Sequence, residues 1–207
     1  MSSQISLFGL SAGVGPGPLG STVQRTDLGA GAWVDIRPSW VDGHDRLFAR
    51  LVDHVAFQAQ RRTMYDRVVD VPRLVRFYDE GELLPDPALE DIRSALSEQY
   101  GEELGEPFAT TGLALYRDGH DSVAWHGDTI GRASTGDTMV AIVSLGASRR
   151  FLLRPRGGGR SLRYQLGHGD LLVMGGSCQR TWEHSVPKTS RNVGPRLSVQ
   201  YRTRGVR

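Results

Sequence analysis

The sequence predicts a mainly β fold with flanking helices (α+β), and two patterns carry this prediction. After about Phe108 the chain consists of eight short apolar runs with turn-forming residues between them. Before that point, two longer stretches repeat their apolar residues with the period of a helix. Short strands separated by turns favour a β-sandwich or jelly roll over a parallel sheet. We expect the two helices to cover the outside of the sheet.

The N-terminal part of the chain begins with an irregular segment. Residues 9–31 are rich in Gly, Ser and Pro with little periodicity, so we predict residues 1–31 to be a flexible extension. Residues 33–36 are a strand candidate. A helix is predicted from Arg46 to about Gln60, because its apolar residues form one stripe. The stripe consists of Leu47, Leu51 and Val55, flanked by Phe48, Val52 and Ala59.

Extended chain and a second helix follow. Residues 69–78 have the composition of a strand, which we expect Pro72 to break. Asp86 is placed to cap a helix that carries Pro87 in its first turn. This helix is predicted to stop near Gly101. Its apolar stripe consists of Leu89, Ile92, Leu96 and Tyr100.

The eight predicted strands fill the rest of the chain, and no internal repeat relates them to one another. They cover residues 113–116, 122–126, 139–145, 150–153, 162–166, 170–174, 182–186 and 196–202.

Composition restricts the class of protein. A chain of 207 residues can bury a sizeable core as one domain. Its single cysteine, Cys178, excludes an intramolecular disulfide framework and cysteine-based zinc sites. No apolar run reaches the roughly 18 residues that cross a bilayer, and the N-terminus lacks the pattern of a signal peptide. We therefore expect a cytoplasmic protein without membrane contact, and a monomer.

Charge is distributed unevenly along the chain. Residues 147–207 contain twelve Arg and Lys188 but only Asp170 and Glu183, a formal charge of +11, so residues 1–146 carry −9 of the total of +2. One interpretation is a polyanionic partner that approaches a basic face. The other is that the acidic and basic halves neutralise each other within one fold. The most basic segment is a turn region with Arg149, Arg150, Arg154, Arg156, Arg160 and Arg163.

Two histidines and one carboxylate form the first candidate site. His126 and Asp128 follow the second predicted strand of the β-rich part, and His184 lies on the penultimate strand. A jelly roll brings such strands together. Two imidazoles and one carboxylate on one face of an octahedron are the ligands of non-heme Fe(II) sites, which keep positions open for a co-substrate and dioxygen. The alternative is that these histidines bind no metal and only form ordinary hydrogen bonds.

The last predicted strand carries the second candidate site. Alternation places Arg196, Ser198, Gln200 and Arg202 on one face of this strand. Four polar groups beside a strand with a metal ligand are unusual for a core. A dicarboxylate co-substrate would explain them, because a guanidinium binds a carboxylate with two hydrogen bonds. The alternative is a solvated edge strand.

With these motifs in place, residues 112–202 resemble the AlkB family of Fe(II)- and 2-oxoglutarate-dependent dioxygenases, which repair alkylated bases by oxidative demethylation. The matching segments are Leu115-Tyr116, His126-Gly127-Asp128, Val143-Ser144-Leu145-Gly146, Arg150-Phe151, residues 169–175, residues 183–187 and Arg196-Leu197-Ser198 with Arg202. The upstream Val71-Pro72-Arg73 is similar to the nucleotide-recognition region of the family. The resemblance implies a double-stranded β-helix, which agrees with the strand count.

The resemblance also implies roles for particular residues. His126, Asp128 and His184 would bind Fe(II). Arg196 would pair with the distal carboxylate of 2-oxoglutarate with help from Tyr116, and Arg202 would lie against its chelating end. An extruded base would stack between an aromatic side chain and His126. The residues predicted to contact the substrate are Tyr65, Phe77 and Tyr78 as stacking candidates, and Arg61, Arg62 and Arg73 as phosphate contacts.

Three positions depart from the family pattern. Ala114 and Ser198 stand where family members commonly have Asn, and Ile130 stands where several repair enzymes have a carboxylate near the lesion. The first two change the surroundings of 2-oxoglutarate, and the third bears on the substrate.

The resemblance implies a demethylase of N-alkylated bases in DNA, of the 1-methyladenine and 3-methylcytosine type. One alternative is a dioxygenase of the same class that acts on modified RNA, a protein side chain or a small metabolite. Another is a non-catalytic module that binds nucleic acid. The expected division of the chain is an extension (1–31) and one dioxygenase domain (32–207), with a helical cover and nucleotide-recognition region (32–107) before the jelly-roll core (108–207).

Overall fold

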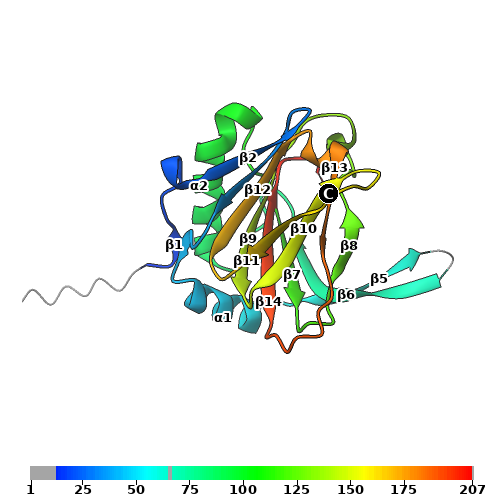
Figure 1. Ribbon diagram of the computed structural model, residues 1–207. Helices are drawn as coiled ribbons and strands as arrows, with labels where there is room; N and C mark the ends of the chain where they lie inside the picture. The colour runs from blue at the N-terminus through cyan, green and yellow to red at the C-terminus, as the bar shows by residue number, and fades with distance from the viewer. Residues whose placement is uncertain (1–12, 65–66, 207) are drawn as a thin grey trace, which may run out of the picture.

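The computed structural model, which describes residues 13–64 and 67–206, contains two facing antiparallel sheets (Figure 1). The larger sheet has eight strands in the order β2-β3-β12-β9-β14-β7-β6-β5, and the smaller has four in the order β11-β10-β13-β8. A two-stranded pair, β1 (Gly15–Pro16) and β4 (Val41–Asp42), accompanies them. The predicted mainly β class and jelly-roll core are thereby confirmed.

All eight strands predicted after Phe108 are present within a residue or a few of their expected ends. They are β7 (Thr110–Tyr116), β8 (Val123–His126), β9 (Val140–Gly146), β10 (Arg149–Pro155), β11 (Leu162–Leu166), β12 (Asp170–Gly176), β13 (Trp182–Val186) and β14 (Arg196–Arg202). β14 lies between β9 and β7 in the middle of the larger sheet. The alternative of a solvated edge strand is therefore wrong.

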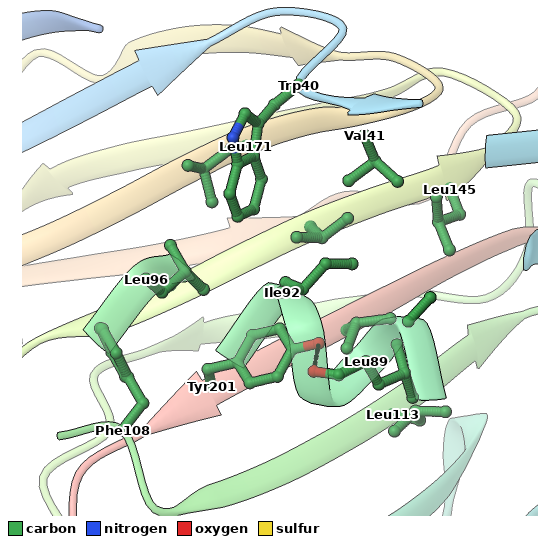
Figure 2. Close-up of a cluster of buried hydrophobic side chains, with 14 of the residues drawn as sticks. Trp40, Val41, Leu89, Ile92, Leu96, Phe108, Leu113, Leu145, Leu171 and Tyr201 are labelled. Atoms are coloured by element: carbon green, nitrogen blue, oxygen red, sulfur yellow. Dashed lines mark hydrogen bonds between the residues drawn. The ribbon is translucent and has the colours of Figure 1, made fainter. Parts of the chain in front are cut away.

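Two helices pack on the outer face of the larger sheet, as predicted (Figure 1). These are α1 (His44–His54) and α2 (Pro87–Leu104), while α3 (Cys178–Thr181), η1 (Gly20–Thr22) and η2 (Arg132–Ser134) are single turns. Leu89, Ile92 and Leu96 of α2 are fully buried against the sheet, and the Tyr201 hydroxyl of β14 donates a hydrogen bond to the Leu89 carbonyl (Figure 2). Among the described residues, no helix is both long and apolar enough to span a membrane.

The ends of α2 follow from local chemistry. The Asp86 carboxylate accepts a hydrogen bond from the Ala88 amide at 3.0 Å, so the predicted N-cap is confirmed. The helix continues past Gly101, where we expected its end, and stops at Gly105, which has φ 74°. A glycine inside a helix costs only about 1 kcal/mol, and the buried stripe offsets that cost. A left-handed residue, in contrast, cannot continue the helix.

Two other expectations in the first half of the chain need correction. The first helix ends at His54 instead of near Gln60, because the chain is already extended in β5 (Gln58–Met64) from Gln58 onward. β6 (Arg67–Tyr78) runs through Pro72 without a break. Proline is tolerated because β7 pairs only with residues 74–78, and the pairing with β5 shifts register nearby.

The N-terminal segment contributes to the sheet. β2 (Gln24–Gly29) pairs with β3 (Ala32–Arg37), although residues 24–29 were expected in a flexible extension. β2 is an edge strand with mostly exposed side chains, so it lacks the apolar alternation that predicts a strand. Residues 1–12 of the expected extension lie outside the described residues.

Candidate metal and co-substrate site

Strands β8 and β13 bring the three predicted metal ligands together between the sheets. His126 and His184 are directly paired across these strands, with ring centroids 4.2 Å apart. Asp128 follows β8, and its carboxylate lies 3.7 Å from Nε2 of His126. One ligand atom from each residue lies within 4.8 Å of the others. Three side chains from distant parts of the sequence can thus close around one ion.

The ring of His126 is oriented for ligation. Its Nδ1 lies 2.8 Å from the Ala124 carbonyl, so this nitrogen carries the proton and leaves the Nε2 lone pair free. The neighbouring position accepts only glycine, because a Cβ on Gly127 would lie 2.5 Å from the Gln179 carbonyl oxygen. This close approach explains why the residue between His126 and Asp128 is a glycine.

Asp128 is held as a charged ligand with only one of its carboxylate oxygens, Oδ1, directed toward the histidines. Both Nε and Nη2 of Arg202 contact its Oδ2 at 2.8 Å, which leaves Oδ1 facing the histidines. Burial alone would raise the pKa of Asp128, but the Arg202 guanidinium and the two imidazoles outweigh burial and lower this pKa below its usual range. The carboxylate is therefore ionised and ready to bind a cation.

His184 is buried and neutral. Burial, the adjacent His126 ring and the guanidinium groups of Arg202 and Arg73 lower its pKa to about 3, against the opposing effect of Asp128. Its ring stacks on Phe151 at a centroid distance of 5.4 Å. A neutral imidazole fixed by an aromatic neighbour is the form that binds a metal.

Arg196 lies buried in the same interior with an unsatisfied donor. Its Nε donates to Ser144 Oγ at 2.9 Å, but Nη1 is buried without a hydrogen-bond partner. No acidic side chain of the described residues forms an ion pair with it, and burial lowers its pKa. A buried, unpaired guanidinium nitrogen costs free energy unless a ligand completes its hydrogen bonds. The arrangement fits the carboxylate of a co-substrate such as 2-oxoglutarate.

The other predicted co-substrate residues surround Arg196. Tyr116 is buried opposite it on β7, with its ring centroid 5.3 Å from the guanidinium carbon. Ser198 is buried two residues further along β14, where Gln200 donates a hydrogen bond to its hydroxyl at 3.3 Å. Ala114 faces Ser198 across the strands, so both departures from the family pattern lie at one place.

The predicted substrate residues separate into two faces of β6. Phe77 is 49% exposed and lies over Gly112 on the interior face, where alternation also places Arg73. Tyr78 is buried in the core under the helices, so the expectation that it stacks on a base is wrong. Arg61 and Arg62 lie on β5, opposite Asp70 and Val69. Tyr65 lies outside the described residues.

The arginine-rich turn is partly structural. Arg149 is buried and donates to the carbonyls of Asp118, Asp121 and Pro187, all at 2.8 Å, so it does not belong to a basic surface. Arg154 pairs with Glu183 at 3.0 Å and lies over the Trp125 ring. Other arginines form salt bridges with carboxylates from the acidic half of the chain, as in the pairs Arg180–Asp137 and Arg204–Glu80. Internal neutralisation therefore accounts for part of the uneven charge, while Arg150, Arg160 and Arg163 stay exposed.

One residue that contacts the site was not anticipated from the sequence. Gln179 of α3 is buried, and its Oε1 accepts a hydrogen bond from the Asp128 amide at 2.9 Å. Its Nε2 lies 3.8 Å from the Met174 sulfur. The contact spans 51 residues of sequence, and no local pattern marks it.

A second group of His44, Asp45 and His168 has the composition of a metal site but not its hydrogen bonding. The Gly146 amide donates to Nδ1 of His168 at 3.1 Å, so the proton of this neutral ring is on Nε2. Nε2 lies 3.0 Å from Asp45 Oδ1 and donates to it. This ring therefore has no nitrogen lone pair left for an ion.

Comparisons with known proteins agree with this geometry. Residues 73–206 match the family model described as the 2OG-Fe(II) oxygenase superfamily. The alpha-ketoglutarate-dependent dioxygenase alkB homolog 3 of Bos taurus is 30% identical over 187 residues, covering 80% of this chain and 64% of its own. The DNA oxidative demethylase ALKBH2 of Mus musculus is 32% identical over 124 residues, covering 56% of this chain and 50% of its own.

This chain thus spans less than two thirds of the length of these relatives. The solved structure of OsALKBH1 superimposes with a TM-score of 0.60 at 14% identity, covering 87% of this chain and 100% of that one, which supports the fold alone. Because the family model covers the strands that carry the triad and Arg196, the chain belongs to the 2OG-Fe(II) oxygenase superfamily and is similar to its AlkB-like members.

Proposed function

We propose that this chain is an Fe(II)- and 2-oxoglutarate-dependent dioxygenase that removes N-methyl groups from alkylated bases in DNA. The observation that carries the proposal is the combination of a closed His126–Asp128–His184 group with a buried Arg196 whose Nη1 lacks a partner. A metal site alone has many uses. A metal site with an adjacent buried carboxylate receptor is what a chelating dicarboxylate requires.

Each residue of the site has a specific task in this proposal. His126, Asp128 and His184 would hold Fe(II). Arg196 would bind the distal carboxylate of 2-oxoglutarate beside Tyr116 and Ser198. Arg202, which lies on β14 like Arg196, keeps Asp128 ionised and oriented.

When bound, Fe(II) and 2-oxoglutarate supply the oxidation: 2-oxoglutarate loses carbon dioxide and becomes succinate with one atom of dioxygen, and the other atom enters a C–H bond of the N-methyl group. The hydroxymethyl group then leaves the base nitrogen as formaldehyde. The chain's own part is to hold the base and exclude water. The exposed Phe77 ring offers a stacking surface, and the half-exposed His126 is the ligand that a base can approach.

The choice of DNA is supported by similarity and by charge. Relatives over more than half of this chain include a protein named as a DNA oxidative demethylase. Arg73 lies on β6, where its Nη1 donates to the Ser122 carbonyl at 3.4 Å just before β8, and Arg61 and Arg62 lie on the adjacent β5. We propose that these three arginines contact phosphates, and that Tyr65 contributes to base stacking.

The test is a turnover assay with alkylated oligonucleotides. Protein loaded anaerobically with Fe(II) and 2-oxoglutarate is exposed to air with oligonucleotides that contain 1-methyladenine, 3-methylcytosine or 3-methylthymine. The expected result is formaldehyde and succinate in equal amounts. His126→Ala should abolish both products, whereas His120→Ala, at an exposed histidine in the β7–β8 turn, should leave them unchanged.

Two contrary outcomes point to the alternatives. Succinate without formaldehyde from any alkylated oligonucleotide would keep the dioxygenase but reject DNA demethylation. The substrate would then be modified RNA, a protein side chain or a small metabolite. Neither product from iron-loaded protein would leave a non-catalytic module that binds nucleic acid.

A further inference from the structure

Two residues next to the metal ligands point away from them, to the outer face of the smaller sheet. Trp125 precedes His126 on β8, and Glu183 precedes His184 on β13. Successive side chains of a strand alternate between its two faces. Because both histidines point into the molecule, Trp125 and Glu183 point outward, and the function proposed above gives neither of them a task.

One side chain from a third strand contacts both of these residues. Arg154 of β10 lies directly opposite Glu183, and its Nε and Nη2 donate to Glu183 Oε2 at 3.2 and 3.0 Å. Its guanidinium carbon also lies 4.1 Å from the centre of the Trp125 ring. Since β13 lies between β10 and β8 in the smaller sheet, the side chain of Arg154 reaches across β13 (Figure 1). A single guanidinium thereby connects three strands on the face opposite the triad.

β8 is the strand that gains most from this connection. It is the outermost strand of the smaller sheet, and it pairs with β13 at His126–His184 and, after a register shift, at one further position. Its beginning is also held from the larger sheet, because the Ser122 amide donates to the Pro72 carbonyl at 2.8 Å. Arg154 contacts β8 further along, one residue before His126.

β10 therefore contacts the two histidine strands from both faces of the sheet. On the inner face, Phe151 stacks on His184 at a centroid distance of 5.4 Å, and the buried Leu153 lies directly opposite His184. These contacts position His184 relative to β10. On the outer face, the Arg154 contacts position β8, and with it His126, relative to the same strand.

We propose that Arg154 is a positioning residue that sets the separation of His126 and His184 from the outer face of the sheet. The inference rests on the triad being the Fe(II) site proposed above. Two imidazoles that bind one ion must be placed to within about 0.5 Å, so a small shift of β8 relative to β13 weakens binding. Arg154 lies on the far side of the sheet from the ion, so its loss removes no ligand.

The test measures Co(II) affinity by visible absorption, at a temperature well below unfolding. Arg154→Leu removes both contacts and should bind Co(II) about tenfold more weakly, at the lower end of the range for residues that support metal ligands. The Glu183 carboxylate that this variant frees would attract a cation, so charge alone predicts the opposite change. Arg154→Lys keeps the charge without the planar fork, and an intermediate affinity is expected.

Two control variants separate positioning from surface charge and from stability. Arg163→Leu removes an exposed arginine from the same face of β11, where it lies opposite Leu152, and should bind Co(II) like wild type. Ile92→Val lowers the stability of the core under α2, on the other side of the larger sheet. Because Ile92 is remote from the triad, this variant should also keep the wild-type Co(II) affinity.

A double variant tests whether Arg154 acts through Trp125. Trp125→Leu removes the ring on β8 and should itself weaken Co(II) binding. Arg154→Leu should then have a smaller effect in the Trp125→Leu background than in wild type, because the two side chains act through one contact.

Wild-type Co(II) affinity in Arg154→Leu, or an equal loss in Ile92→Val, would overturn the inference. The same effect of Arg154→Leu in both backgrounds would also overturn it. A wild-type chain that binds no Co(II) would instead reject the triad as a metal site, and the proposed function with it.

Discussion

Arg196 is the residue where function and stability are expected to oppose each other. In the absence of 2-oxoglutarate its buried Nη1 has no partner, so Arg196→Met should unfold at the same temperature as wild type or a higher one. Added 2-oxoglutarate should raise the melting temperature of wild type but not of this variant. Thermal unfolding with Mn(II) in place of iron measures both effects.

The control for this prediction is Arg191→Met at an exposed position of the loop before β14, which should respond to 2-oxoglutarate like wild type. Arg196→Lys keeps the charge without the planar fork, so an intermediate response is expected. A full 2-oxoglutarate shift in Arg196→Met would show that the co-substrate binds elsewhere.

Gln179 gives the second prediction at this scale. It fixes the backbone of Asp128 without touching the metal position itself, and such supporting contacts typically change metal affinity about 10–100-fold. Gln179→Ala should therefore weaken Co(II) binding, followed by its visible absorption, within that range. Gln165→Ala, at an exposed glutamine, is the control. An unchanged Co(II) affinity in Gln179→Ala would reduce Gln179 to a packing residue.

At the scale of elements, the β7–β8 turn positions the strand that carries His126. Asp121 is buried in this turn, where burial would raise its pKa, but hydrogen bonds from the Arg117 side chain and backbone lower the pKa below its ordinary value. A carboxyl whose pKa is lowered by folding stabilises the folded state above the unfolded pKa, near 4. That contribution is lost as the pH falls through the lower folded value.

This linkage predicts a pH-dependent difference between wild type and Asp121→Asn. Urea unfolding at pH 6 should show the variant to be less stable, and the gap should narrow at pH 3 because the wild-type carboxyl begins to protonate. Asp91→Asn, on the exposed side of α2, controls for the loss of one carboxylate. A gap that stays constant between the two pH values would show that Asp121 acts through shape instead of charge.

Helices and strands could be predicted from the sequence where the apolar residues followed a single period, either that of a helix or that of a strand. The strands after Phe108 and the core stripe of α2 have apolar faces that only one register can bury, so local sequence was sufficient. β2 escaped prediction because an exposed edge strand needs no apolar face. Tyr78 was grouped with Phe77 as a stacking candidate, but neighbouring residues of a strand point to opposite faces, and here only Tyr78 enters the core under the helices.

The sequence identified the ligand-type side chains that the structure brings together, but not the residues that support them. His126, Asp128, His184 and Arg196 were found because metal and carboxylate ligation need particular side chains at particular strand positions. Gln179 and Arg149 act through backbone groups, which any sequence provides, so their partners leave no trace in the pattern. Three-dimensional contacts were needed to assign them.

At the scale of the whole molecule, the N-terminal strand is expected to be part of the folding unit. Arg25 of β2 pairs with the buried Asp35 of β3 at 2.8 Å and with Glu103 of α2 at 3.0 Å, and the Tyr100 hydroxyl donates to Asp35 at 3.0 Å. These contacts connect β2 and β3, at the edge of the larger sheet, to the covering helix α2. A boundary at residue 32 would cut through it.

A chain shortened to residues 32–207 should therefore be less stable than the full chain, although the triad and Arg196 are retained. The loss of Arg25 leaves Asp35 buried with a single donor, which costs about 2–3 kcal/mol. The loss of β2 also exposes the backbone of β3 as a new edge. Arg25→Gln in the full chain separates the two effects, because it removes only the ion pair. If urea unfolding gave the shortened chain the stability of the full one, residues 32–207 would be the complete domain.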